Sequence, residues 1–281
     1  MTSPDLPTFR SDDATTRFGL DGYDETTYGD SFADVYDEWY DDLADDDFVA
    51  VVAALLPAES ARVLELGVGT GRLLEKLRRL RPDSGDDYSG IDSSDAMLHR
   101  AHTRLGDRAH LVTGDFSRTL PTGPFDVVFV GYNTLFNLPD AESLASCMGL
   151  VAERLAPGGS FVVDATFPVD DDASSTSDQS TSDHVGIRTM RTGEVVLTVS
   201  RHDPAARRII GQFVSYVDGE RVRLRPWVVR YWPPEELDRV AETAGLTLVA
   251  RTADGAGTPY VSGGNRHISH YRRRTGNLDD Q

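Results

Sequence analysis

The feature that most constrains this chain is a short apolar run followed at once by a glycine-rich turn. Val63, Leu64 and Leu66 form the run, and Gly67-Val68-Gly69-Thr70-Gly71 follows it. Such a run, bounded downstream by glycines, is typical of a strand buried in a parallel sheet. Three glycines at this spacing let the backbone turn tightly and let a ligand lie on the main chain, because no Cβ is in the way. We therefore predict a ligand-binding turn at this point.

A helix is predicted from about Thr70, because leucines follow at helical spacing, and its first N–H groups point at whatever lies in the turn. The third glycine comes two residues after the second, which departs from the dinucleotide fingerprint G-x-G-x-x-G. The Lys-Ser/Thr pair of a P-loop is missing too. Glu65, two residues before the first glycine, suits a cationic or amine-bearing ligand better than a phosphate. The turn therefore argues against a nucleoside triphosphate.

Further segments follow the turn in order: Y-S-G-I-D at 88–92, G-D-F at 114–116, F-D-V-V-F-V at 125–130 and L-A-P-G-G-S-F-V-V at 155–163. Together with V-L-E-L-G-V-G-T-G-R at 63–72, they resemble the motifs of the class I S-adenosylmethionine (SAM)-dependent methyltransferases. The resemblance implies an α/β fold. It predicts a Rossmann-like seven-stranded class I methyltransferase sheet with helices on both faces, plus an inserted antiparallel β-sheet.

The resemblance also implies a set of contacts to SAM. Glu65 is expected to hold the methionine amine, and Arg72 or Tyr28 the carboxylate. Asp92 lies about 20 residues after the turn, where a carboxylate takes both ribose hydroxyls, and Asp115 is expected to take the adenine amine. The other residues expected to bind the cofactor are Tyr36, Gly67, Gly69, Gly71, Ser93, Met97, Gly114, Phe116 and Gly131.

The segment from Tyr28 to Asp37 resembles the N-terminal lid of a small-molecule N-methyltransferase branch that includes antibiotic amino-sugar dimethylases. In that branch, tyrosines at the positions of Tyr28 and Tyr36 close over SAM. Phe32, Tyr36 and Trp39 recur at helical spacing, which predicts a helix with Asp30 or Ser31 as its N-cap. The alternative is that these aromatics only pack on the sheet.

Candidate substrate contacts follow the fourth and fifth predicted strands, at the edge where ligands of open α/β sheets bind. Asn137 stands where the amino-sugar branch has a histidine near the substrate amine; an amide orients a nucleophile but does not accept a proton at neutral pH. Asp164, at the end of the fifth strand, is either a loop carboxylate or a catalytic base. Tyr132, Asn133 and Arg266 are the expected substrate-binding residues.

Composition changes along the chain predict six segments. The low-complexity run of Asp, Ser and Thr predicts a loop, and alternating Val195, Leu197 and Val199 with the Asp218-Gly219 turn predict a hairpin sheet. Arg221, Arg223 and Arg225 share one strand face, which is either solvated or turned to an anionic substrate. The segments are a disordered arm (1–17), a helical lid (18–57), the SAM-binding core (58–168), a mobile acidic loop (169–184), an inserted substrate cover (185–231) and the completion of the core (232–274).

The composition excludes several classes of protein. The chain has 281 residues and a net charge of −18, which opposes binding to nucleic acid or to an anionic membrane. Cys147 is the only cysteine, so neither an intramolecular disulfide nor a cysteine-based zinc site is expected. The first residues lack the pattern of a signal peptide, and no apolar run is long enough for a membrane span. We expect a cytoplasmic protein, with a homodimer as one option for its assembly.

The predicted function is transfer of a methyl group from SAM to an amine of a small molecule, in natural product biosynthesis. A hydroxyl acceptor is less favoured because it needs a base. No metal is expected, because the sulfonium already makes the methyl carbon electrophilic. One alternative is methylation of a peptide N-terminus. Another is a non-catalytic methyltransferase-like protein that binds SAM or serves as a scaffold.

Overall fold

The structure is a computed structural model that describes residues 18, 20–40, 45–167 and 181–274. A seven-stranded sheet forms its centre, in the order β10-β11-β5-β4-β1-β2-β3. β11 runs antiparallel to both of its neighbours, and the pairs from β5 to β3 are parallel. The strands are β1 (Arg62–Leu66), β2 (Asp87–Asp92), β3 (His110–Thr113), β4 (Phe125–Val130), β5 (Leu155–Thr166), β10 (Leu246–Thr252) and β11 (Arg266–Arg273).

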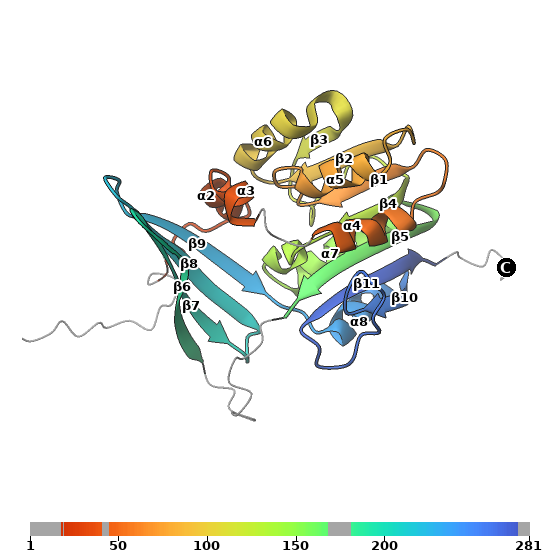
Figure 1. The fold of residues 1–281 in the computed structure, drawn as a ribbon. Coiled ribbons are helices and arrows are strands. Elements are labelled where there is room, and N and C mark those ends of the chain that lie inside the picture. The colour runs from red at the N-terminus through yellow and green to blue at the C-terminus, as the bar shows by residue number, and fades with distance from the viewer. Residues whose placement is uncertain (1–17, 19, 41–44, 168–180, 275–281) are drawn as a thin grey trace, which may run out of the picture.

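Helices cover both faces of this sheet, as Figure 1 shows. The alternation of side chains along β4 separates the two layers: Val127 and Phe129 pack in one cluster, and Val128 and Val130 in the other. α4 (Asp45–Ala54), α5 (Arg72–Leu80) and α6 (Asp95–Leu105) contribute to the first cluster, and α7 (Ala141–Arg154) and α8 (Pro234–Thr243) to the second. The α/β fold class predicted from the sequence is confirmed.

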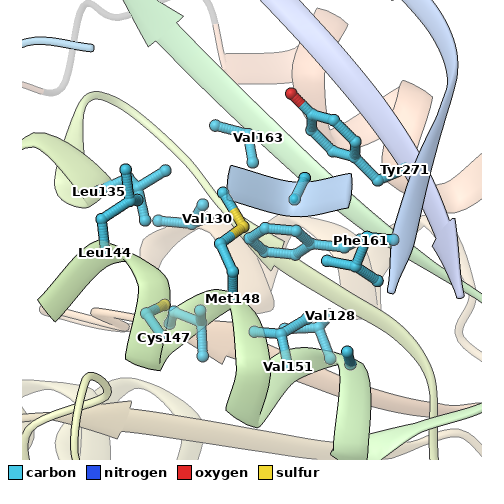
Figure 2. Packing of buried hydrophobic residues seen from close by; sticks show 14 of the residues in the cluster. Val128, Val130, Leu135, Leu144, Cys147, Met148, Val151, Phe161, Val163 and Tyr271 are labelled. Carbon is cyan, nitrogen blue, oxygen red and sulfur yellow. The ribbon is translucent and has the colours of Figure 1, made fainter. Parts of the chain in front are cut away.

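The core beneath α7 is tightly filled (Figure 2). Val128, Phe161 and Val163 point from the sheet toward Cys147 and Met148 of the helix, and all five side chains are fully buried. Each such side chain stabilises the fold by about 1.5–3 kcal/mol relative to an exposed one. Burial raises the pKa of the Cys147 thiol to about 12. Cys147 is therefore a packing residue that stays protonated at neutral pH.

A second, four-stranded antiparallel sheet is inserted between β5 and α8, as predicted. It consists of β6 (Ser182–Arg191), β7 (Glu194–Asp203), β8 (Arg208–Val217) and β9 (Arg223–Arg230). Residues 182–184, which the sequence assigned to the acidic loop, belong to β6. Of the other residues of that loop, only residue 181 is described, and 169–180 lie outside the described residues. The predicted N-terminal arm, residues 1–17, also lies outside them.

Two short helices lie between the inserted sheet and the core (Figure 1): α2 (Thr27–Phe32) and α3 (Tyr36–Tyr40). The predicted helix is thus divided, and the predicted N-cap at Asp30 or Ser31 is wrong. The reason is that the Asp24 carboxylate accepts hydrogen bonds from the backbone N–H groups of Thr26 and Thr27, at 3.0 and 3.1 Å. These bonds satisfy donors at the start of α2 and begin the helix several residues earlier.

Candidate active site

The glycine turn after β1 has a backbone that requires glycine. Gly67, Gly69 and Gly71 have φ values of 63°, 54° and 77°, a region that side chains with a Cβ seldom adopt. A Cβ on Gly67 would lie 2.2 Å from Thr134 Cγ2, and one on Gly71 would lie 2.8 Å from Leu105 Cδ1. A Cβ on Gly69 would meet no atom closer than 4.0 Å. Packing therefore excludes side chains at two of the glycines, whereas the third faces open space.

Two cavities meet at this turn. The larger has a volume of about 370 Å³ and the smaller about 20 Å³, and both are lined by Tyr36, Gly67, Gly69 and Thr134. The larger cavity brings together Tyr28, Asp92, Ser93, Met97, Asp115, Phe116 and Asn137 from the predicted site. The smaller one brings together Glu65, Arg72, Gly131 and Tyr132. Most of the residues predicted to hold SAM thus surround one connected hollow.

Asp92, the last residue of β2, fixes the turn as well as lining the larger cavity. Its Oδ2 accepts a hydrogen bond from the Gly69 N–H at 2.8 Å, and its Oδ1 accepts one from the Ser94 N–H at 2.9 Å. A carboxylate has about four acceptor sites, so both oxygens retain capacity for a ligand. Burial raises the pKa of Asp92. Gly114, which lines neither cavity, donates its N–H to the Asp92 carbonyl at 2.9 Å.

Glu65 is a buried carboxylate without a partner for one of its oxygens. It lies on β1 with 3% of its surface exposed, and Oε2 has no hydrogen bond among the described residues. Burial raises its pKa well above the ordinary value. Leaving a buried polar group unsatisfied costs about 1–3 kcal/mol. A cation in the smaller cavity would remove that cost, so this side chain fits the methionine amine of SAM.

Arg72, predicted to take the SAM carboxylate, reaches the same cavity but is already paired. Its guanidinium contacts the fully buried carboxylate of Asp45 and lies 5.1 Å from the ring centroid of Tyr132. Asp45 also pairs with Lys76 at 3.3 Å. Asp45 therefore fixes the guanidinium of Arg72, the first residue of α5, against the Tyr132 ring in the loop after β4.

The adenine side of the predicted site gathers at the ends of β2 and β3. Met97 is 2% exposed and lines the larger cavity beside Phe116. Asp115 Oδ1 accepts hydrogen bonds from the backbone N–H and the hydroxyl of Ser117 at 2.8 and 2.7 Å. Its Oδ2 pairs with Arg118 at 3.1 Å. Both oxygens of the Asp115 carboxylate thus already have partners within the protein.

Three predicted substrate residues line neither cavity. The Asn133 side chain bonds the backbone N–H and carbonyl of Thr166, at 2.6 and 3.0 Å, and so ties the β4 loop to the end of β5. Asp164 pairs with Arg266 at 2.9 Å, and Arg266 also contacts Asp47 at 3.0 Å. These contacts join α4, β5 and β11. A catalytic role for Asp164 and a substrate contact by Asn133 or Arg266 thus have no cavity to support them here.

The structure adds lining residues that the sequence reasoning missed. They come from the segment before α2, the loop after β3, the short helix after β4 and the first turn of α7: Tyr23, Asp24, Glu25, Arg118, Thr134 and Ser143. The Asp24-x-Thr26-Thr27 cap was a readable signal for the first group, because it marks where α2 begins. Ser93 Oγ donates to the Glu25 carbonyl at 2.6 Å and holds this segment at the end of β2.

Comparison with known proteins identifies the family. The family described as "Methyltransferase domain" matches residues 63–159. The solved CcbJ methyltransferase from Streptomyces caelestis is 36% identical, with a TM-score of 0.78 over 90% of this chain and 100% of that chain. The chain belongs to the SAM-dependent methyltransferases. The seven-stranded sheet and the glycine turn are therefore family features of this methyltransferase.

Two curated relatives carry more specific names. A cypemycin N-terminal methyltransferase from Streptomyces sp. is 27% identical over 76% of this methyltransferase and 84% of its own length. A dTDP-3-amino-3,4,6-trideoxy-alpha-D-glucopyranose N,N-dimethyltransferase from Streptomyces venezuelae is 31% identical over 47% of this methyltransferase and 56% of its own length. Two uncharacterized methyltransferases are matched over only part of their length. This chain covers 52% of the one from Geobacillus sp. and 66% of the one from Geobacillus thermodenitrificans.

The described residues also bear on metal binding and on membrane insertion. Within the described ranges, no group of three or more His, Cys, Asp and Glu side chains is placed to hold a metal ion. None of the helices formed by those residues has both the length and the apolar character needed to cross a membrane.

Proposed function

We propose that this methyltransferase transfers the methyl group of SAM to an amine of a small molecule. The observation that carries the proposal is the buried Oε2 of Glu65, which has no hydrogen bond among the described residues and lies beside a glycine turn that Asp92 holds. In this proposal Glu65 binds the methionine amine, Asp92 the ribose and Asp115 with Phe116 the adenine. SAM supplies an electrophilic methyl group when bound. Tyr28, Tyr36 and Met97 exclude water from the larger cavity, and the lining side chains align the acceptor.

The lining of the larger cavity favours an amine over a hydroxyl. It contains no histidine, lysine or cysteine among the described residues. By the resemblance to the amino-sugar branch, Asn137 takes the position of a histidine, and its amide does not accept a proton at neutral pH. A hydroxyl acceptor must lose its proton to a base, whereas an amine can lose it to water before the transfer. Asp24 and Glu25 at the rim attract a protonated amine from solution. The amine then lies among polar side chains that orient it.

The charges around the larger cavity favour an acceptor without a phosphate group. Its lining includes four carboxylates, from Asp24, Glu25, Asp92 and Asp115, and one guanidinium, from Arg118. Arg118 is paired with Asp115. Among the described lining residues there is therefore no cationic side chain without a partner that could bind a phosphate. An uncoupled amino sugar or another free amine is therefore a better acceptor than a nucleotide-linked sugar. A peptide N-terminus is the second candidate, because the cypemycin relative matches more of this chain than the sugar relative does.

A binding and transfer experiment tests this function. Calorimetric titration with S-adenosylhomocysteine (SAH), the demethylated product, is expected to give a micromolar or lower Kd. Transfer from methyl-labelled SAM is then compared among a free amino sugar, its dTDP-linked form, a short peptide and a phenol. We expect the free amine to be labelled fastest. Absence of SAH binding at millimolar concentration contradicts the enzymatic role, and labelling of the phenol alone contradicts the amine acceptor.

The raised pKa of Glu65 leads to a prediction about pH. The buried carboxyl binds a proton more readily in the free protein, and an ammonium beside it favours the carboxylate. Binding of SAH should therefore release a proton, and affinity should rise with pH, by up to about tenfold per unit, until the pH passes the raised pKa. Calorimetry between about pH 5 and 8 measures this slope. Glu65→Gln should bind more weakly and with a flat profile; an equal slope in both proteins would contradict the assignment.

A further inference from the structure

The inserted sheet contacts the lid through an ion pair between a buried arginine and a half-exposed carboxylate. The Arg225 side chain on β9 is 7% exposed, and its guanidinium contacts the Asp34 carboxylate at 2.6 and 2.9 Å. It also donates to the Ser31 carbonyl. Arg223 contacts the same carboxylate at 2.9 Å. Two arginines of the predicted row, Arg223 and Arg225, thus face the lid, and neither solvent alone nor an anionic substrate accounts for them.

Asp34 lies in the short connection between α2 and α3, which separates the two lid tyrosines. Phe32, just before it, is fully buried, and the Tyr28 ring stacks on the Phe32 ring with centroids 4.5 Å apart. Tyr36 follows two residues after Asp34 and lines both cavities. Any shift of Asp34 away from β9 would therefore move both cavity-lining tyrosines.

Aromatic contacts extend the same junction. The rings of Phe32 and Trp39 meet Phe213 of β8 edge to face, with centroids 5.7 and 5.3 Å away. Arg188, an extra residue at the bulge in β6, donates to the Trp39 carbonyl at 2.7 Å and stacks over its ring at 4.8 Å. Arg188 and Arg225 of the sheet therefore both donate hydrogen bonds to backbone carbonyls of the lid.

The core holds the opposite side of the lid by one ion pair and by neutral donors. Arg104 of α6 contacts the Asp37 carboxylate at 2.9 Å. Ser94 Oγ donates to Asp30 at 2.6 Å, and Thr70 Oγ1, in the glycine turn, donates to Asp37 at 2.6 Å. Opening the lid toward solvent breaks these contacts and also separates the Arg225 guanidinium from the Asp34 carboxylate and the Ser31 carbonyl. Arg225 is the more buried of the two arginines that pair with the lid, with 7% of its side chain exposed against 27% for Arg104. Its pair is therefore less screened by solvent than the pair at the core.

We propose that Arg225 is a positioning residue for cofactor binding: through Asp34, the inserted sheet keeps α2 and α3 closed over the cavity. The proposal rests on the SAM site of the proposed function. The proposal gives the inserted sheet a second role. Besides covering the acceptor, the sheet would hold the lid over the cofactor. When the closed lid is only partly populated, the apparent Kd rises by the inverse of that fraction.

Three variants, at two positions on β9 and one just before it, test the proposal. Arg225→Met removes the buried fork, Arg223→Met removes an exposed partner of the same carboxylate, and Arg221→Met is the matched control, since Arg221 has no ion pair within the described chain. We expect SAH affinity to fall at least tenfold for Arg225→Met, less for Arg223→Met and less than twofold for Arg221→Met. Backbone hydrogen exchange should accelerate at least tenfold in residues 27–40 of Arg225→Met and stay unchanged in β1 and α5.

Further comparisons separate positioning from general stability. Arg225→Lys keeps the charge without the fork and should give an intermediate Kd. Asp34→Ala should lower affinity, and its effect should not add to that of Arg225→Met. A lower unfolding temperature with an unchanged Kd for Arg225→Met would overturn the proposal, as would additive effects. If the wild type binds no SAH, the proposed function fails by itself, while the exchange rates of residues 27–40 still decide whether Arg225 holds the lid.

Discussion

Gly67→Ala is expected to abolish detectable SAH binding at millimolar concentration and to lower the free energy of unfolding by about 2–4 kcal/mol. The positive φ of 63° disfavours alanine, and the new Cβ would lie 2.2 Å from Thr134 Cγ2. Thr134 begins the 3₁₀ helix η2 (Thr134–Asn137), which carries cavity residues after β4. The clash should therefore displace both the turn and this loop. Denaturant unfolding and calorimetry measure the two effects.

Two further variants separate the causes. Gly69→Ala has a similar φ of 54° but no close neighbour, so it should lose only about 1 kcal/mol of stability. Because Gly69 lines both cavities, its methyl group should still weaken SAH binding. Adding Thr134→Ser to Gly67→Ala removes the clashing methyl and should recover part of the stability. Full stability and affinity in Gly67→Ala alone would show that the turn tolerates a side chain.

Asp92→Ala is expected to weaken SAH binding by about 10- to 100-fold. The substitution removes the acceptor proposed for the ribose and also the carboxylate that accepts from Gly69 and Ser94. Asp92→Asn should also weaken binding, because its NH₂ group would face one of two N–H donors. Calorimetric titration of both variants with SAH measures the loss.

Asp95→Ala provides a matched control for Asp92. Asp95 begins α6 close by, is exposed and lines neither cavity, and its carboxylate accepts only a hydrogen bond from Thr113 Oγ1 at 3.0 Å among the contacts described. SAH affinity should change less than twofold in this variant. An Asp92→Ala protein with the Kd of the wild type would remove Asp92 from the cofactor site.

Local pattern was sufficient to predict much of the fold. The apolar run before Gly67 and the acid at Asp92 mark strand ends, and parallel strands bring such ends to one edge of the sheet. Period-two alternation likewise predicted the inserted sheet. These features depend on neighbours in sequence, so spacing alone reveals them. The residues they predicted for SAM mostly surround the two cavities.

Long-range pairing was not readable in the same way. Arg225 pairs with Asp34, which is 191 residues away in the sequence, and Arg266 pairs with Asp164, which is 102 residues away. A row of arginines has the same sequence pattern whether it meets solvent, a substrate or a carboxylate of the same chain, and only the packed fold distinguishes these cases. Asp164 was predicted to close the fifth strand, but it lies inside β5, two residues before the end of the strand at Thr166. The direction of its carboxylate was decided by β11, which comes much later in the chain.

The junction between β9 and the lid has a consequence for exchanging parts between relatives. A chimera that replaces residues 182–230 to change the acceptor also replaces Arg188 and Arg225, while Asp34 and Trp39 remain in the host. Such a graft would alter the retention of the cofactor together with the choice of acceptor. The smallest exchangeable unit therefore comprises residues 27–40 and the inserted sheet, although some 140 residues of core separate them in the chain.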